Sequence, residues 1–214
     1  MTTTEFREAT SGMQDEQEAQ RRAEIRRLIE ECGAVRRGHF KLASGKHSDV
    51  YIEKFRVLER PKVLRRVCTE IAEHFRGKRP EIVIGPATGG MMVALMVADI
   101  LGIDVVYVEA DPEGNRVLRR GGSIPRGTKT LLVDDVLTTG SSLFDVLKVP
   151  DVKGSDLIGV GVLIDRSEAT IDFGAEFFAA SRFEAKSYLP EDVPDWLAII
   201  PVEIPGTSAA RKGL

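Results

Sequence analysis

The sequence predicts an α/β fold, in which a mostly parallel sheet is flanked by helices. Two observations lead to this prediction. Short runs of apolar, largely β-branched residues recur along the chain, at Ile82–Ile84, Val105–Val108, Thr130–Val133 and Ile158–Ile164. Helical segments alternate with these runs, and strands that are apolar throughout are typical of a parallel sheet covered on both faces. Such sheets bind ligands in the loops beyond the carboxyl ends of their strands.

Before the first of these strands, the sequence predicts a helix, two short strands and a second helix. Residues 1–15 lack apolar periodicity, so we expect a disordered tail there. The amphipathic helix that follows ends at Gly33. Its apolar stripe consists of Ile25, Leu28, Ile29 and Cys32. Gly38–Ile52 suggests two short strands around a turn. The second helix starts near Pro61, a favoured first-turn residue, and ends at Gly77.

The later elements complete the sheet and its edges. Met91–Leu101 has the pattern of a helix that is apolar on most sides and therefore buried. Ala175–Phe183 and Trp196–Pro205 are expected to add edge strands, and residues 208–214 to be disordered. We therefore expect a single domain over residues 16–207.

Composition excludes several classes of protein. The net charge of −3 over 214 residues gives no reason to expect nucleic-acid binding. Cys32 and Cys68 form no Cys-x-x-Cys pair, so a zinc site is not expected. The polar N-terminus lacks the apolar core of a signal peptide, and Met91–Ala98 is too short to span a membrane. We expect a soluble, cytoplasmic protein.

Leu131–Ser142 is the most informative segment for function. A buried strand ends in Asp134 and Asp135, and a hydroxyl-rich loop containing Gly140 leads into a helix. Free backbone N–H groups and hydroxyls favour a phosphate in the loop. The two carboxylates would repel that phosphate, but they accept hydrogen bonds from neighbouring hydroxyls. The pattern therefore predicts a ribose 5-phosphate site. The alternative is that the loop only caps a helix and that Asp134 and Asp135 are solvated. A Walker loop is excluded because its motif is absent.

This segment resembles the ribose-phosphate loop of the type I phosphoribosyltransferases, which use phosphoribosyl pyrophosphate (PRPP) as donor. The resemblance covers roughly residues 34–205. It implies that Asp134 and Asp135 hold the ribose hydroxyls and act in catalysis. It also implies that PRPP is bound by Asp134, Asp135, Val136, Leu137, Thr138, Thr139, Gly140, Ser141 and Ser142.

Gly85–Gly90 is similar to the pyrophosphate loop of that family, with Thr88, Gly89 and Gly90 as PRPP-binding residues. Bare backbone N–H groups at a helix start suit a pyrophosphate. A tight turn that needs glycine is the alternative explanation of Gly89 and Gly90. Some orotate phosphoribosyltransferases have a lysine where Gly89 stands.

Gly38–Ile52 resembles the N-terminal hood of orotate phosphoribosyltransferases, which is expected here over about residues 34–56 together with C-terminal strands. The resemblance implies that the base is bound by Ser44, Lys46, Tyr51, Thr138 and Arg166. Tyr51 could stack on a flat pyrimidine. A lysine common in the family is replaced by Ala43, and Lys46 or Lys54 is a candidate to compensate. Solvated loop residues are the alternative for Lys46 and His47.

Arg166 follows the strand Ile158–Ile164 and matches the family's Asp-Arg-x-Glu element, which contacts orotate. An arginine can grip a carboxylate through two hydrogen bonds, and orotate carries a carboxylate. A plain ion pair of Arg166 with Asp165 or Glu168 is the alternative.

Residues 109–126 are long and rich in glycine and charge, as expected of a mobile lid. In many orotate enzymes the lid carries Lys and His and closes over a neighbouring subunit's site. Here it offers Arg116, Arg119 and Arg120, and Arg116 is the candidate catalytic residue. Val117-Leu118 suggests a hairpin strand.

The resemblance implies transfer of the phosphoribosyl group from PRPP to orotate, with Mg²⁺ bound through PRPP and not directly by the protein. It also implies a homodimer. Two alternatives remain open: transfer to another nucleobase, and a non-catalytic regulator that senses PRPP. The absence of Lys and His from the lid favours the regulator.

Overall fold

The computed structural model describes the backbone of residues 3–119 and 122–205, and the side chains from residue 16 onward. A six-stranded sheet forms its centre, in the order β5-β4-β3-β6-β7-β8. The strands are β3 (Ile82–Pro86), β4 (Asp104–Ala110), β5 (Arg116–Leu118), β6 (Lys129–Leu137), β7 (Asp156–Asp165) and β8 (Phe177–Arg182). All neighbouring pairs are parallel except β4 and β5. The predicted parallel sheet is thus confirmed.

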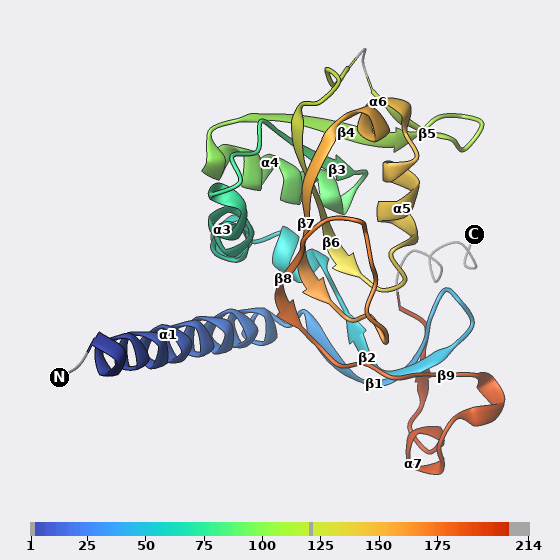
Figure 1. Cartoon of the computed structure of the whole chain (residues 1–214). Coiled ribbons are helices and arrows are strands. Elements are labelled where there is room, and N and C mark those ends of the chain that lie inside the picture. Colours follow the sequence, from blue (N-terminus) through green and yellow to red (C-terminus); the bar gives the residue numbers. More distant parts are fainter. Residues whose placement is uncertain (1–2, 120–121, 206–214) are drawn as a thin grey trace.

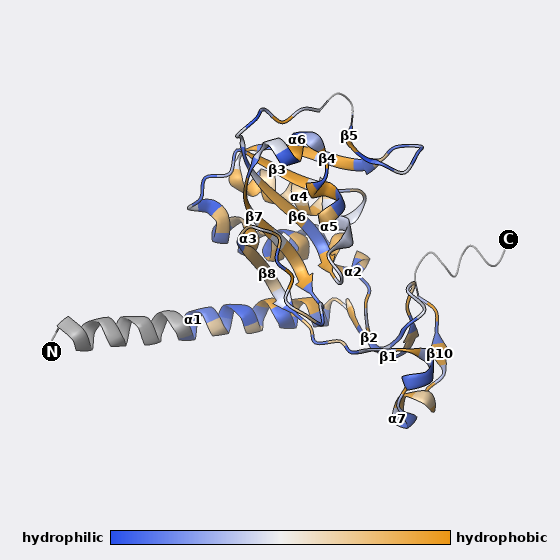
Figure 2. Cartoon of the chain, turned by 45° about the vertical axis from the view of Figure 1, so that its right-hand side comes forward, coloured by the Kyte–Doolittle hydropathy of each residue, from blue (hydrophilic) through white to orange (hydrophobic). Residues whose placement is uncertain are grey.

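Helices cover both faces of this sheet because its strands are apolar on both sides (Figure 1). In β6, Leu131 and Val133 belong to one buried cluster and Leu132 belongs to the other. The first cluster includes residues of α3 (Pro61–Arg76) and α4 (Gly89–Leu101), and the second includes residues of α5 (Ser141–Leu147) and α6 (Pro150–Gly154). Figure 2 shows the apolar strands enclosed between these helices.

A four-stranded sheet forms the hood, in the order β10-β1-β2-β9. Its strands are β1 (Val35–Lys41), β2 (His47–Ile52), β9 (Ser187–Tyr188) and β10 (Val202–Glu203). Short helical turns accompany them: α2 (Phe55–Leu58), η1 (Pro190–Asp192) and α7 (Asp195–Ala198). The two strands predicted within residues 38–52 are confirmed as the antiparallel pair β1 and β2.

Side-chain hydrogen bonds join the two ends of the chain within the hood. Nδ1 of His39 lies 3.1 Å from the carbonyl oxygen of Ile200, and its Nε2 lies 2.6 Å from Nδ1 of His47. Because a carbonyl only accepts, His39 carries its proton on Nδ1, and the proton shared by the two rings belongs to His47. Ser48, fully buried, donates from Oγ to the carbonyl of Lys186 at 2.8 Å.

The N-terminal helix α1 (Thr3–Glu31) is longer than the sequence predicts. It begins inside the segment 1–15, where a tail is expected, and it projects away from the sheet (Figure 1). Periodicity gives no signal there because this part has no apolar stripe. A helix that is already nucleated extends at little cost, since each added residue gains a backbone hydrogen bond. Residues 1–2 and the expected tail at 208–214 lie outside the described residues.

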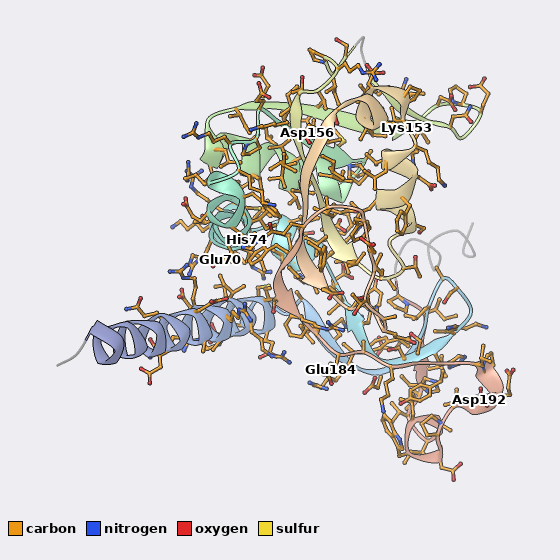
Figure 3. All side chains as sticks on the ribbon, viewed as in Figure 1. Glu70, His74, Lys153, Asp156, Glu184 and Asp192 are labelled. Atoms are coloured by element: carbon orange, nitrogen blue, oxygen red, sulfur yellow. The ribbon has the colours of Figure 1, made fainter. Side chains whose placement is uncertain are left out.

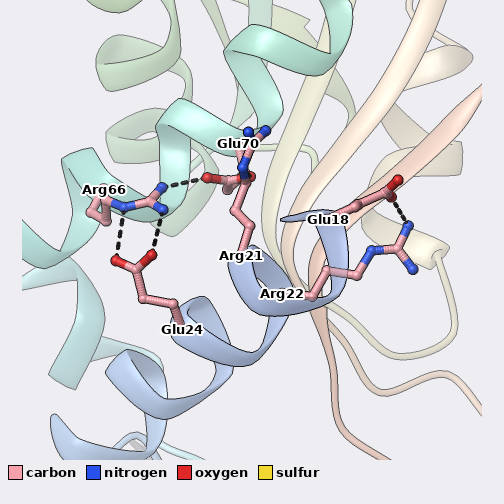
Figure 4. A network of polar contacts seen from close by, with 6 residues as sticks. All are labelled: Glu18, Arg21, Arg22, Glu24, Arg66 and Glu70. Carbon is pink, nitrogen blue, oxygen red and sulfur yellow. Dashed lines mark hydrogen bonds and ion pairs between the residues drawn. The ribbon is translucent and has the colours of Figure 1, made fainter. Parts of the chain in front are cut away.

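Ion pairs link α1 to α3 (Figure 4). Arg66 on α3 bonds Glu24 on α1 at 3.1 Å and also pairs with Glu70 within its own helix. Arg21 of α1 lies 4.0 Å from Glu70. A cavity of about 470 Å³ lies beside these pairs, between α1, α3 and β8. Its charged lining is thus largely paired.

The carboxyl ends of the parallel strands face the hood. In Figure 3, Lys153 in α6 and Asp156 at the start of β7 lie at the end of the sheet far from the hood, whereas Glu184 lies next to the hood and Asp192 lies within it. The loops that follow β3, β6 and β7 therefore open toward β1 and β2. In the part of the chain that the structure describes, no helix is long and apolar enough to cross a membrane.

Candidate active site

Asp134 and Asp135 stand near the end of β6, with exposures of only 7% and 4%. They are therefore not solvated surface acids. Oδ1 of Asp134 accepts a hydrogen bond from the N–H of Asp135 at 2.8 Å, and Oδ1 of Asp135 accepts one from Val136 at 2.6 Å. Burial, and then the charge of Asp135, raises the pKa of Asp134 to about 7. The remaining oxygens can accept hydrogen bonds from a ligand's hydroxyl groups.

The loop Thr138–Ser142 follows this pair and lines a cavity of about 140 Å³ together with Asp134. Gly140 is the N-cap residue of α5 and has a φ of 78°, a conformation that favours glycine. Thr138, Thr139 and Ser141 are exposed. The hydroxyl of Thr139 donates to Oγ of Ser141 at 3.2 Å, and its contact with the N–H of Ser141 is long, at 3.4 Å. Helix capping therefore does not account for the hydroxyls of this loop.

The turn Gly85–Gly90 packs directly against the carboxylates. A Cβ atom on Gly89 would lie 1.6 Å from Oδ2 of Asp135, and one on Gly90 would lie 2.9 Å from Oδ1 of Asp134. Neither glycine has a positive φ. At Gly89 the carboxylate of Asp135 excludes a side chain. At Gly90 the nearest atom is Cδ of Pro86 in the same turn, 2.6 Å from the Cβ position, so the tight turn also requires glycine there. The two loops predicted to bind pyrophosphate and ribose phosphate are adjacent.

Thr88 lies at the exposed edge of the same turn. It is the N-cap residue of α4, but its side chain makes no capping hydrogen bond. Its hydroxyl therefore remains available to a ligand above the turn.

Lys54 extends from the end of β2 toward the carboxylates. Its Nζ lies 2.8 Å from Oδ2 of Asp135, with side-chain exposures of 40% and 6%. No donor among the described residues is aligned to hydrogen-bond Oδ2, so the contact is an ion pair without good hydrogen-bond geometry. The sequence marks Lys54 only as a candidate to compensate for Ala43, and nothing in the sequence predicts its contact with Asp135.

Arg166 follows β7 and is 7% exposed. Its backbone N–H donates to the carbonyl of Leu137 at 2.9 Å, which holds it beside the end of β6. Its Nε is buried and has no hydrogen-bond partner among the described residues. Burial lowers its pKa, although nearby Glu168 opposes this effect. A buried guanidinium with an unsatisfied N–H suits a carboxylate ligand.

The acids beside Arg166 have other partners. Asp165 lies 3.7 Å from Nη1 of Arg182, and Glu168 accepts a hydrogen bond from the N–H of Ser187 at 3.1 Å. A plain ion pair with either acid therefore does not account for Arg166.

Tyr51 of β2 is half-buried, with its ring centroid 5.6 Å from that of Phe40. Burial raises the pKa of its hydroxyl, whereas the charges of Lys54 and Arg166 are near enough to lower it. Tyr51 is therefore placed within electrostatic reach of both cations, where a flat ring could rest against it.

Other predicted site residues do not join this cluster within one chain. Ser44 and Lys46 are exposed in the turn between β1 and β2. Arg116 borders a cavity of about 360 Å³ beside Asp145 and Lys148, on the side of α5.

The rest of the lid is only partly described. Arg119 pairs with Glu109 at 2.6 Å, and Arg120 lies outside the described residues. The hairpin strand predicted at Val117-Leu118 is confirmed as β5.

Comparisons with known proteins agree with this geometry. Residues 56–175 match the family model described as the phosphoribosyl transferase domain. The chain is 40% identical over 186 residues to an orotate phosphoribosyltransferase of Pelotomaculum thermopropionicum, covering 87% of this chain and 97% of that protein. It is 37% identical over 180 residues to one of Caldanaerobacter subterraneus, covering 84% and 94%. The crystal structure of the orotate phosphoribosyltransferase from Aeropyrum pernix superposes with a TM-score of 0.64 at 30% identity, covering 73% of this chain and 92% of that one.

Proposed function

The chain belongs to the orotate phosphoribosyltransferases, and from this premise we propose that it transfers the phosphoribosyl group of PRPP to orotate. The products are orotidine 5'-monophosphate and pyrophosphate, in the biosynthesis of pyrimidine nucleotides. The observation that supports this most directly is the contact between two loops: the turn at Gly89 and Gly90 meets Asp134 and Asp135. A sugar held by the acids has its pyrophosphate next to the turn and its 5-phosphate next to Thr138–Ser142.

Within this site each group has a separate role. Asp134 and Asp135 accept hydrogen bonds from the two ribose hydroxyls and so orient the sugar. A ring nitrogen of the base displaces pyrophosphate from the anomeric carbon, and the sugar develops positive charge as the bond to pyrophosphate breaks. The negative charge of the buried acids stabilises that transition state.

We propose that Mg²⁺ accompanies PRPP. Among the described residues, no group of three or more His, Cys, Asp or Glu side chains is placed to hold a metal ion alone. Asp134 and Asp135 would act through the metal's water shell, because Mg²⁺ keeps several waters and these waters can donate hydrogen bonds to the buried carboxylates. When bound, the metal would neutralise phosphate charge.

Orotate is the base that this site suits, because it carries a carboxylate. Arg166 offers that group a buried guanidinium with an unsatisfied Nε–H. Tyr51 lies near enough to receive the pyrimidine ring. Thr138 is exposed near the same strand end, whereas Ser44 and Lys46 are assigned to the base from the family resemblance alone.

The experiment mixes the purified protein with PRPP, Mg²⁺ and orotate and follows the loss of orotate absorbance, with uracil and adenine in parallel. Consumption of orotate alone supports the proposal. In Arg166→Met, the KM for orotate should rise about ten- to a hundredfold, because a charge-assisted pair is lost, while the KM for PRPP changes little.

Arg182→Met is the matched control, since Arg182 is a neighbouring arginine with an exposed side chain. Turnover with uracil or adenine would favour another nucleobase. Binding of PRPP without any turnover would favour the regulator.

We further propose that the enzyme is a homodimer whose interface includes an apolar patch beside the site. The patch consists of Phe55 on α2 and of Met92 and Leu95 on α4, with exposures of 41%, 40% and 55%. Exposed apolar patches commonly mark protein interfaces. Arg116, which does not reach the site of its own chain, would then be free to serve the partner's site.

A further inference from the structure

The pyrophosphate turn has no positive side chain of its own. Gly85–Gly90 contains neither lysine nor arginine. Pyrophosphate leaves the reaction with several negative charges, and backbone N–H groups carry only partial charges. A cationic side chain from elsewhere in the chain would therefore favour its binding and departure.

Lys54 brings such a charge to the turn. Its Nζ lies 3.3 Å from the point where a Cβ of Gly89 would stand. The space above Gly89 is therefore filled by the carboxylate of Asp135 and the ammonium group of Lys54, which lie 2.8 Å apart. The ammonium group thus lies at the junction between the predicted pyrophosphate turn and the ribose-binding acids.

The ion pair between Lys54 and Asp135 can separate, so that each group takes a different partner. The side chain of Lys54 is 40% exposed, so its ammonium group can move. Its backbone is fixed, because its carbonyl accepts hydrogen bonds from Val57 at 3.0 Å and Leu58 at 3.1 Å in α2. Oδ2 of Asp135 has no aligned donor, so a ribose hydroxyl would make a better hydrogen bond with it than Lys54 does.

We propose that Lys54 exchanges partners when PRPP binds, releasing Asp135 to a ribose hydroxyl and moving its ammonium group onto the pyrophosphate above Gly89. In the free enzyme Lys54 offsets the charge of the buried acid. In the complex it is a pyrophosphate-binding residue. This inference deepens the proposed function and rests on it.

The test is calorimetric binding of inorganic pyrophosphate in the presence of Mg²⁺, compared with binding of orotidine 5'-monophosphate, which has no pyrophosphate. Lys54→Met should weaken pyrophosphate binding and raise the KM for PRPP about ten- to a hundredfold. Binding of the monophosphate should change less than about threefold. Lys54→Arg should recover most of the pyrophosphate affinity, because it restores the positive charge.

Lys62→Met is the matched control, since Lys62 is an exposed lysine on α3. Thermal unfolding of each variant verifies that it is folded. Pyrophosphate affinity equal to that of the Lys62 variant would overturn the proposal, as would equal losses for pyrophosphate and the monophosphate. So would a folded Lys54→Arg variant as weak as Lys54→Met.

These outcomes are separable from failure of the proposed function. A wild-type protein that binds pyrophosphate through Lys54 but does not consume orotate refutes the reaction and retains the role of Lys54. A wild-type protein that consumes orotate, with Lys54→Met unaltered, refutes the role of Lys54 alone.

Discussion

At the scale of single residues, the carboxylate of Asp134 connects stability with catalysis. It is 7% exposed, and its pKa of about 7 lies above the unfolded value of about 3.9. The folded state therefore holds this proton more tightly than the unfolded state. The stability that results is fully present below about pH 4 and is lost as the pH rises through 7.

Asp134→Asn should therefore raise the free energy of unfolding at pH 8 by about 1–4 kcal/mol relative to wild type, and this advantage should shrink toward pH 4. Turnover should fall at least about a hundredfold, because the ribose loses a charged acceptor. Urea unfolding between pH 4 and 8, with assays at pH 8, measures both effects.

Asp145→Asn provides the control for that experiment. Asp145 is hydrogen-bonded to the surface residue Lys148, which lowers its pKa. Asp145→Asn should therefore not raise the free energy of unfolding at pH 8. Parallel stability curves for wild type and Asp134→Asn would show that Asp134 does not titrate near neutral pH.

The sequence predicts well those site residues that are close together in the chain. Asp134, Asp135 and the loop Thr138–Ser142 form one continuous motif, and the structure places them around one cavity. The contact of Lys54 with Asp135 joins residues far apart in the sequence, and no local pattern encodes it. The reason for glycine at position 89 is hidden likewise, because the group that excludes a side chain lies on another strand.

At the scale of elements, the hood depends on side-chain hydrogen bonds more than on apolar packing at its C-terminal edge. There β10 has only two residues, both exposed, and α7 buries only Leu197. The bond from His39 to the carbonyl of Ile200 anchors this segment to β1. Local apolar patterns therefore predict the six-stranded sheet better than this edge of the hood, where few apolar side chains are buried.

His39→Phe should loosen that edge selectively. Phenylalanine keeps an aromatic ring, somewhat larger than imidazole, but loses the hydrogen bonds to Ile200 and His47, at a cost of about 1–3 kcal/mol. Hydrogen exchange followed by mass spectrometry should show faster exchange in residues 195–205, while β6 and β7 remain protected.

The matched control is His74→Phe. His74 lies on α3 and pairs at the surface with Glu176, 2.6 Å away, so its loss should not affect the hood. Faster exchange throughout the molecule after His39→Phe would contradict a local anchoring role.

At the scale of the whole molecule, the patch of Phe55, Met92 and Leu95 lies close to Lys54, because α2 begins directly after that residue and contacts α4. An interface there would fix α2 and, through it, the backbone from which Lys54 extends. Formation of the dimer would then influence pyrophosphate binding through α2 and Lys54.

Leu95→Glu should shift the protein toward monomers, because a charge buried in an apolar interface has no partner. Light scattering after size-exclusion chromatography, over a range of concentrations, measures the change. Leu189→Glu is the control, since Leu189 is a leucine of similar exposure in the C-terminal part of the chain. If Leu189→Glu gave monomers and Leu95→Glu did not, the interface would lie at the hood and not at α4.

The contact of Gly89 with Asp135 also has an evolutionary consequence. A side chain at position 89 cannot be added while Asp135 and Lys54 keep their present places, since its Cβ would overlap a carboxylate oxygen. Substitutions at positions 54, 89 and 135 are therefore expected to be epistatic, since the effect of each depends on the residues at the other two. A lineage that placed a cationic side chain at residue 89 would also have to move the carboxylate of Asp135 away from the turn, so a substitution at position 89 alone would be disfavoured.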